Sequence, residues 1–207
     1  MSEDALLELI LDKAGAGQRI MIGIAGPPGA GKSTLAEALC ARLNERLSDD
    51  PALVVPMDGF HFDNDILVAQ GLLPRKGAPQ TFDVAGFHHL LTRLRGPEPE
   101  IGIPVFDRDR DLARAGARLI TPVQRILLIE GNYLLLKMEP WSRLKSLFDL
   151  TVFLPVPMSL LEERLVQRWL DHGLTLSAAE TRARGNDIPN AALVLAESQP
   201  ADCILRY

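Results

Sequence analysis

The amino-acid sequence predicts an α/β fold in which helices cover both faces of a mainly parallel sheet. Apolar runs at 20–25, 53–56, 126–129 and 150–154 have the composition of strands that are buried on both faces. Segments with helical periodicity alternate with these runs, and no internal repeat or linker interrupts the chain. Because 207 residues is an ordinary size for one domain, we expect a single domain over residues 1–207.

Composition and charge exclude several classes of protein. The chain is 47% hydrophobic and 24% charged, which is typical of a folded globular protein and not of a disordered one. Its net charge of −5 comes without a basic patch, so we expect no nucleic-acid partner. No apolar run approaches the roughly 20 residues that span a membrane, and residues 1–18 lack the basic start of a secretory signal. A cytoplasmic location is therefore the expectation.

The predicted helices have recognisable ends. Ser2 is a predicted cap for a short helix, which Gly15 and Gly17 stop and which we expect to pack outside the core. Further helices are predicted at 32–47, at 84–94 after a cap at Asp83, at 158–170 and at 175–196, with a last strand at 202–205. Cys40 and Cys203 belong to no metal-binding or CxxC pattern, so we expect both to be buried and reduced.

The loop after the first strand carries the most specific motif of the chain. The residues from Gly26 to Ser33 satisfy GxxxxGK[ST] between a predicted strand and a predicted helix. Glycines let successive backbone N–H groups converge on phosphate oxygens at the positive end of a helix, Lys32 would bridge the β- and γ-phosphates, and Ser33 would bind Mg²⁺. The alternative is a glycine-rich turn that only connects the strand to the helix. The predicted ATP-binding residues are Gly26, Pro27, Pro28, Gly29, Ala30, Gly31, Lys32, Ser33 and Thr34.

The motif at residues 26–33 is that of a P-loop. A P-loop does not by itself identify the reaction, because kinases, GTPases and motor ATPases share it. The chain has no Asn-Lys-x-Asp segment that would read guanine, and it is too short to hold a motor or transporter as well. Two classes stay open: an ATP-dependent kinase, and a nucleotide-dependent switch or assembly ATPase. Acids and arginines placed after the strands favour the kinase.

Several segments resemble one family of P-loop kinases, in the same order along the chain. They are Met57-Asp58-Gly59-Phe60-His61-Phe62, Arg75-Lys76-Gly77 to Phe82-Asp83, Pro104-Val105-Phe106-Asp107, Ile129-Glu130-Gly131-Asn132-Tyr133, and Arg164 to Gly173. This order is similar to that of the phosphoribulokinase, uridine kinase and bacterial pantothenate kinase family. The likeness is greatest with small bacterial kinases called fructose transport system kinases. Uridine kinases have Asn-Phe-Asp-His-Pro where this chain has Thr81-Phe82-Asp83-Val84-Ala85, a departure that weakens a nucleoside assignment.

The resemblance implies a three-layer P-loop NTPase fold with a helical lid over about 160–190, and an enzyme that uses ATP and Mg²⁺. The activity it implies is transfer of the γ-phosphate to an alcohol group of a small metabolite. A sugar or related polyol is the acceptor we favour, and pantothenate-type and nucleoside-type acceptors remain alternatives. The sequence leaves open whether the chain forms a homodimer.

The predicted catalytic residues are Asp58, Lys32, Arg168 and Arg164, and the predicted metal ligands are Ser33, Glu130 and Asp58. Asp58 follows the strand at 53–56 and is the predicted general base, with a plain Asp-Gly turn as the alternative. Glu130 ends the strand at 126–129 and is predicted to reach the Mg²⁺ shell with Ser33 and Asp58, the alternative being a carboxylate that faces solvent. Arg164 and Arg168 lie four residues apart on one helix and would stabilise the transferring phosphoryl group, Arg168 being slightly preferred. Ordinary surface ion pairs are the alternative for both arginines.

The resemblance also implies the acceptor pocket, whose predicted residues are His61, Arg75, Asp83, Phe106 and Arg108. Each has a structural alternative: Asp83 is also a helix cap, Phe106 a core residue, and Arg75 with Lys76 a solvated loop pair. Asn186 and Asn190 are expected near the adenine on resemblance alone. His88 and His89 have no partner ligands and are read as surface or hydrogen-bonded residues.

Overall fold

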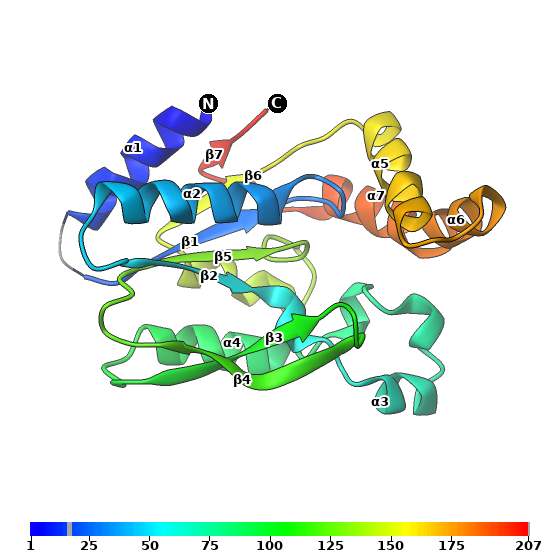
Figure 1. Cartoon of the computed structure of the whole chain (residues 1–207), viewed down its shortest axis with the longest axis horizontal. Helices are drawn as coiled ribbons and strands as arrows, with labels where there is room; N and C mark the ends of the chain where they lie inside the picture. The colour runs from blue at the N-terminus through cyan, green and yellow to red at the C-terminus, as the bar shows by residue number, and fades with distance from the viewer. Residues whose placement is uncertain (16–17, 207) are drawn as a thin grey trace.

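A parallel five-stranded sheet forms the centre of the molecule (Figure 1). The computed structural model describes residues 1–15 and 18–206. The strands, in the spatial order β2-β5-β1-β6-β7, are β1 (Ile20–Ala25), β2 (Ala52–Pro56), β5 (Ile126–Gly131), β6 (Leu150–Phe153) and β7 (Cys203–Ile204). Every strand that the sequence predicts is present, which confirms the α/β class.

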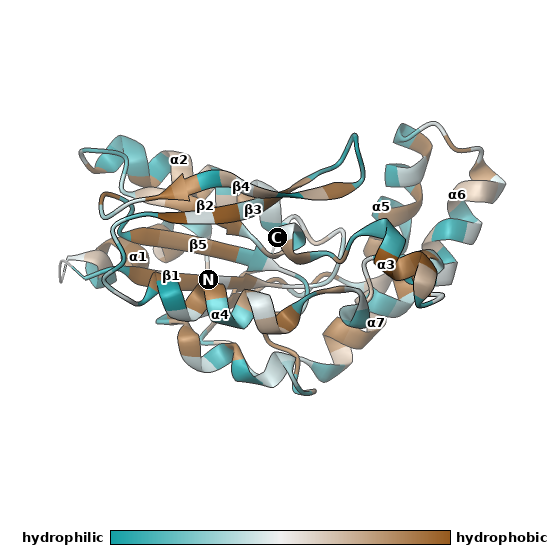
Figure 2. Cartoon of the chain, turned by 90° about the horizontal axis from the view of Figure 1, so that it is seen from below, coloured by the Kyte–Doolittle hydropathy of each residue, from teal (hydrophilic) through white to brown (hydrophobic). Residues whose placement is uncertain are grey.

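Helices cover both faces of this sheet. On one face lie α1 (Glu3–Ala14) and α2 (Lys32–Arg46), and on the other lies α4 (Val84–Leu94) (Figure 1). Alternate residues of each strand point to opposite faces, so Ile22 and Leu128 join one hydrophobic core while Met21, Leu127 and Ile129 join the other. Figure 2 shows the resulting hydrophobic strands β1 and β5 inside the molecule.

The register of the sheet brings three functional segments to one edge. Ala25 of β1 pairs with Gly131 of β5, and Pro56 of β2 pairs with Glu130. The P-loop follows Ala25, and the short 3-10 helix η1 (Met57–Phe60) follows Pro56. Because parallel strands end at the same edge, the P-loop, Asp58 and Glu130 lie side by side.

The N-terminal helix corrects one expectation. Ser2 caps α1 by accepting a hydrogen bond from the Ala5 N–H at 3.2 Å, as predicted, but the helix belongs to the core. Leu6, Leu7 and Ile10 are fully buried, and α1 packs on α2. The expectation that it lies outside the core was wrong because packing on α2, which no local pattern reveals, buries this face. Gly17, the second predicted stop, lies outside the described residues.

The two cysteines differ in burial. Both are free, and Cys203 is buried as predicted. Cys40, in the middle of α2, is only half-buried, because it packs against the core from the side of an open hollow, and its Sγ donates to the Ala52 carbonyl at 3.4 Å. The prediction that Cys40 is buried was therefore wrong.

An antiparallel hairpin, to which the sequence analysis assigned no strands, packs below the sheet beside α4 (Figure 1). It consists of β3 (Ile101–Asp107) and β4 (Leu112–Ile120). Only its base is buried, at Ile101, Ile103 and Ile120, and its register shifts around Pro104, so no regular alternation marks it in the sequence.

The C-terminal helices project from one end of the sheet, where the sequence analysis expects a lid, and are called the lid helices below (Figure 1). They are α5 (Met158–Asp171), α6 (Leu176–Arg182), a π-helical turn η6 (Ala183–Asp187) and α7 (Ile188–Glu197). Facing them is the segment with α3 (Asn64–Ala69) and the 3-10 turns η2 (Leu73–Arg75) and η3 (Pro79–Thr81). Two more 3-10 turns, η4 (Trp141–Arg143) and η5 (Lys145–Leu147), precede β6. Among the described residues, no helix is long and apolar enough to cross a membrane.

Candidate active site

The P-loop forms a cradle that fits a polyphosphate. Gly29 and Gly31 adopt left-handed backbone conformations with φ of 80° and 88°, which glycine tolerates best. No atom lies within 4 Å of where a Cβ would stand on Gly31, so the approach to the first turn of α2 is open. Free N–H groups and the positive end of the helix dipole meet there, and both attract anions.

Lys32 supplies a buried cation to this cradle. Its side chain donates to the Pro27 carbonyl at 2.9 Å, and the residue is only 7% exposed. Burial lowers the pKa of Lys32 to about 8, although the nearby carboxylates of Glu130 and Asp58 oppose the shift. Polyphosphate oxygens beside the ammonium would favour its charged form.

Two carboxylates face the P-loop from the neighbouring strand ends. Glu130 is 7% exposed, so the alternative of a carboxylate facing solvent is wrong. Burial and then the charge of Asp58 raise the pKa of Glu130, whereas Lys32 and a hydrogen bond from Ser33 lower it. A buried carboxylate that lies beside a second acid is suited to a bound cation.

The residues present fit a magnesium ion held jointly with phosphate. Within 1–15 and 18–206, no group of three His, Cys, Asp or Glu residues could hold a metal by itself. Mg²⁺ usually binds through one or two carboxylates together with substrate phosphates and waters. Ser33 and Glu130, with Asp58 beside them, match that mode of binding.

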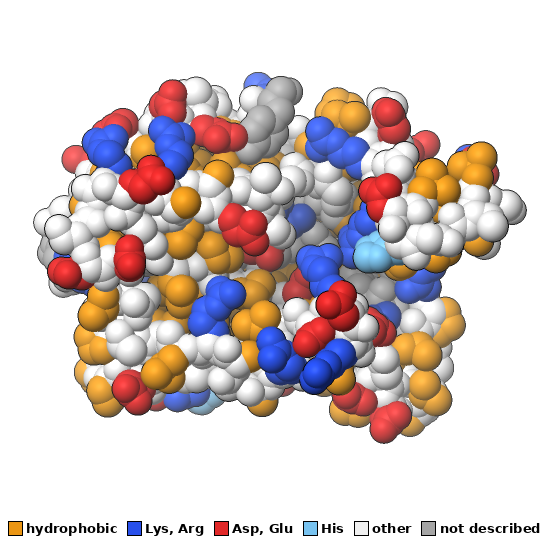
Figure 3. Space-filling model, in the orientation of Figure 1, with side chains coloured by type: hydrophobic (Ala, Val, Ile, Leu, Met, Phe, Trp, Pro, Cys, Tyr) orange, Lys and Arg blue, Asp and Glu red, His pale blue; other side chains and the backbone are white. Residues whose placement is uncertain are grey.

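A cavity of about 670 Å³ opens beside the P-loop between η1, the β3–β4 hairpin and the lid helices. Figure 3 shows the hollow between the body of the molecule and the lid, with basic and acidic side chains around it. Among its lining residues are Asp58, His61, Phe82, Phe106, Arg108 and Arg168. The structure thus brings Asp58, His61, Phe106, Arg108 and Arg168 together, as the sequence analysis expects.

His61 lines this cavity and is held in place by its neighbours. Its Nδ1 lies 2.8 Å from the Asp58 carbonyl oxygen, which can only accept, so Nδ1 carries the proton. The ring packs between Phe82 and Phe106, with centroids 4.0 and 4.7 Å away. Burial lowers the pKa of His61, which leaves Nε2 as a neutral hydrogen-bond acceptor.

Arg75 and Asp83 do not line this cavity. They border a separate, mostly apolar hollow of about 590 Å³ next to Trp141 and Leu193. Asp83 caps α4 by accepting from the Gly86 N–H at 2.8 Å, and Arg75 donates to the Gly185 carbonyl at 3.1 Å. The structural alternative for Asp83 is therefore realised.

The two lid arginines also differ. Arg168 lines the cavity, whereas Arg164 is not among the lining residues and donates to the Gly29 carbonyl of the P-loop at 3.2 Å. Neither makes the surface ion pair that was the alternative, within the described part of the chain. Asn186 and Asn190 are both buried, and Asn190 borders the cavity.

Sequence reasoning missed other residues at the cavity. Trp169 donates from its indole N–H to Asp187 at 2.6 Å, and the guanidinium carbons of Arg168 and Arg182 lie 5.8 and 5.2 Å from its ring. Lys76 also borders the cavity, although the sequence analysis did not assign it to the acceptor pocket. No local signal marks this set, because α5, α6 and η6 bring these residues together by packing.

Comparison with known proteins identifies the family. The chain is 35% identical over 199 residues to a Schizosaccharomyces pombe protein provisionally named uridine kinase C227.14, covering 91% of this chain and 83% of the relative. The chain belongs to the family of P-loop kinases that includes uridine kinases and pantothenate kinases. This kinase is also 48% identical to a structurally characterised protein from Silicibacter sp. TM1040, provisionally named a fructose transport system kinase, with a TM-score of 0.92 over 99% of both chains.

Two further matches are partial. The pantothenate kinase of Limosilactobacillus reuteri is 29% identical over 78% of this kinase and 52% of the relative. The family model for the methylmalonyl Co-A mutase-associated GTPase MeaB matches residues 1–55, a region with the P-loop but neither the acid at the end of β5 nor the lid. The named relatives are kinases, and the protein is accordingly a phosphotransferase.

Proposed function

We propose that this kinase transfers the γ-phosphate of ATP to a hydroxyl group of a sugar or related polyol, with Asp58 as the general base. The observation that carries the proposal is the position of Asp58. It borders the 670 Å³ cavity and lies at the edge of the sheet where the P-loop begins and where Glu130 lies. A general base has to reach both the acceptor hydroxyl and the phosphate site, and the position of Asp58 suits both requirements.

The remaining residues take complementary roles in this proposal. Backbone N–H groups from Gly26 to Thr34 and the ammonium of Lys32 hold the phosphates. Ser33, Glu130 and Asp58 would hold Mg²⁺, which neutralises phosphate charge when it is bound. Asp58 accepts the proton of the acceptor hydroxyl, whose oxygen bonds to the γ-phosphorus as the bond from that phosphorus to the leaving ADP oxygen breaks. Arg168, with Arg164 nearby, faces the negative charge of the transferring group.

The cavity favours a small acceptor with several hydroxyl groups. Phe82 and Phe106 supply an apolar wall, and His61 Nε2 can accept a hydrogen bond from a hydroxyl. Arg108, whose Nη2 lies 3.5 Å from Asp58 Oδ2, can donate to an acceptor oxygen. The names of the relatives support pantothenate or a nucleoside equally well, but the departure at residues 81–85 disfavours a nucleoside.

An acceptor screen tests the proposal. Sugars, glycerate, pantothenate and nucleosides are each added to enzyme and MgATP, and acceptor-dependent ADP release is measured. We expect a sugar or sugar-like polyol to raise ADP release well above the basal rate. In Asp58→Asn that stimulation should fall by about 10²-fold or more while nucleotide affinity changes little.

Asp63→Asn is the matched control. Asp63 lies five residues later, is exposed, and only caps α3 through the Asp65 N–H. Its variant should keep the stimulated rate. Stimulation by pantothenate or a nucleoside alone would overturn the polyol assignment, and an unchanged rate in Asp58→Asn would overturn the role of Asp58.

A further inference from the structure

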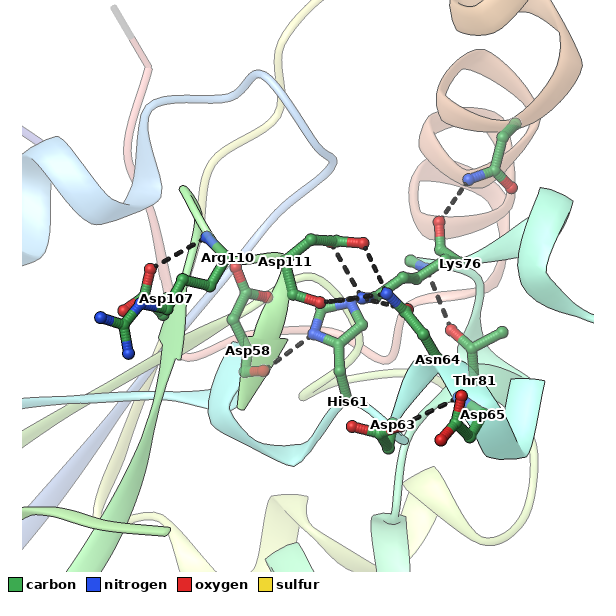
Figure 4. A network of polar contacts seen from close by, with 12 residues as sticks. Asp58, His61, Asp63, Asn64, Asp65, Lys76, Thr81, Asp107, Arg110 and Asp111 are labelled. Carbon is green, nitrogen blue, oxygen red and sulfur yellow. Dashed lines mark hydrogen bonds and ion pairs between the residues drawn. The ribbon is translucent and has the colours of Figure 1, made fainter. Parts of the chain in front are cut away.

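The ammonium group of Lys76 has a complete set of hydrogen-bond acceptors. Nζ lies 2.7 Å from Asn64 Oδ1, 2.6 Å from the Asp111 carbonyl oxygen and 2.9 Å from Asp111 Oδ1 (Figure 4). Its side chain is 8% exposed although it borders the cavity. Because an ammonium has three protons, Lys76 has none left for a substrate. A buried, saturated cation of this kind holds structural parts together.

On one side, Lys76 holds the tip of the β3–β4 hairpin. Asp111 ends the hairpin turn in a left-handed conformation with φ of 53°, which costs free energy unless other contacts maintain it. Its carboxylate also accepts from Asn64 Nδ2 at 3.1 Å, and Lys76 Nζ lies 5.0 Å from the centroid of the Phe106 ring. The position of this hairpin sets how Phe106 and Arg108 stand over the cavity.

On the other side, residues 74–77 are bound to the lid. The Pro74 carbonyl accepts from Arg182 at 3.2 Å, and the Lys76 carbonyl accepts from the buried Asn186 side chain at 2.7 Å. Arg75 donates to the Gly185 carbonyl at 3.1 Å. These contacts join segments more than 100 residues apart, and they reach the π-helical turn between α6 and α7.

We infer that residues 74–77 couple the acceptor-site hairpin to the lid helices, with Lys76 as the positioning residue. The two sets of contacts originate in one short segment, so a displacement of the hairpin tip is transmitted to Arg182 and η6. Arg182 and Arg168 both contact the Trp169 ring, so the link reaches Arg168, which lines the cavity. Only the functional meaning of the link rests on the proposed acceptor site.

Hydrogen–deuterium exchange of the full chain, with and without the non-hydrolysable analogue MgAMP-PNP, tests the coupling. Lys76→Met keeps the length of the side chain and removes the charge. We expect the rate of amide exchange to rise about fivefold or more both at the hairpin, over 108–115, and in the lid, over 176–190. About fivefold is the lower end of measured couplings between sites. Coupling is reciprocal, so Arg75→Met, on the lid side, should also raise exchange at the hairpin.

Two variants complete the test. Asp111→Asn removes the ion pair but keeps the carbonyl contact, so it tests the same link if Lys76→Met unfolds. Its rise in lid exchange should be smaller than that in Lys76→Met. Arg114→Ala breaks an ion pair within the hairpin, with Asp107 at 3.4 Å, and should leave amide exchange in the lid unchanged.

Hairpin exchange that rises in Lys76→Met or Asp111→Asn without any change in the lid would overturn the proposal. A rise in lid exchange in Arg114→Ala as large as that in Lys76→Met would also overturn it, because any disturbance of the hairpin would then destabilise the lid. The measurement uses no acceptor, so it is independent of whether the acceptor screen and Asp58→Asn bear out the proposed function.

Discussion

Gly59 is the point where the β3–β4 hairpin approaches the turn that carries Asp58. A Cβ added there would stand 2.5 Å from the Pro104 carbonyl oxygen and 2.7 Å from its carbon, and both are rigid backbone atoms. Ordinary contacts begin near 3.4 Å, so Gly59→Ala requires the hairpin and the turn to separate by about 0.9 Å. This movement would carry Phe106 and Arg108 away from Asp58.

A displacement of about 1 Å at a catalytic site can lower the rate by about 10²-fold. We therefore expect Gly59→Ala to reduce acceptor-stimulated ADP release by up to that factor and stability by about 1–3 kcal/mol. Nucleotide affinity should stay within about twofold, because the P-loop contacts are unchanged. The assay pairs steady-state kinetics, using the acceptor from the screen, with calorimetric binding of MgAMP-PNP and urea unfolding.

Gly102→Ala is the matched control for this experiment. The same substitution on the same hairpin would place a Cβ 3.5 Å from the Gly116 Cα, which is an ordinary contact. It should keep nearly normal rates. Wild-type kinetics in Gly59→Ala would refute the argument that this glycine sets the distance between the hairpin and Asp58.

Three further predictions follow from the site and the core. In the free enzyme the pKa of Glu130 is raised to about 7, chiefly by burial. MgATP binding at pH 6 should therefore release close to one proton, and the affinity for MgATP should fall as the pH drops below 7. Calorimetry in two buffers measures the proton release, and release that persists in Glu130→Gln would contradict this prediction. The Lys32 pKa of about 8 predicts the opposite linkage near pH 9, where binding should take up a proton; no uptake at pH 9 would count against a lysine buried in this way. Leu6→Ala should lower the free energy of unfolding by about 2–5 kcal/mol in urea denaturation, and a loss no larger than that of the half-exposed Leu9→Ala would contradict the place of α1 in the core.

The candidate site could be predicted only where its chemistry is local in the chain. The P-loop residues, Asp58 and Glu130 each follow a strand, and the parallel register brings those strand ends together. Arg75 and Asp83 were assigned to the acceptor pocket by resemblance, yet they border another hollow. Their side-chain directions depend on how η2, η3 and α4 pack, and no local pattern carries that information.

By itself, the sequence determined the strands of the sheet, the polyphosphate cradle and the acid at the start of η1, because hydrophobic periodicity, glycine conformation and strand-end position act over a few neighbouring residues. Only the tertiary structure decided that α1 is core, that a hairpin covers the site, and that Lys76 is buried between that hairpin and the lid. These features depend on contacts between distant segments, such as the hydrogen bond from Asn186 to the Lys76 carbonyl across 110 residues. The free energy of such contacts exists only once the chain has packed.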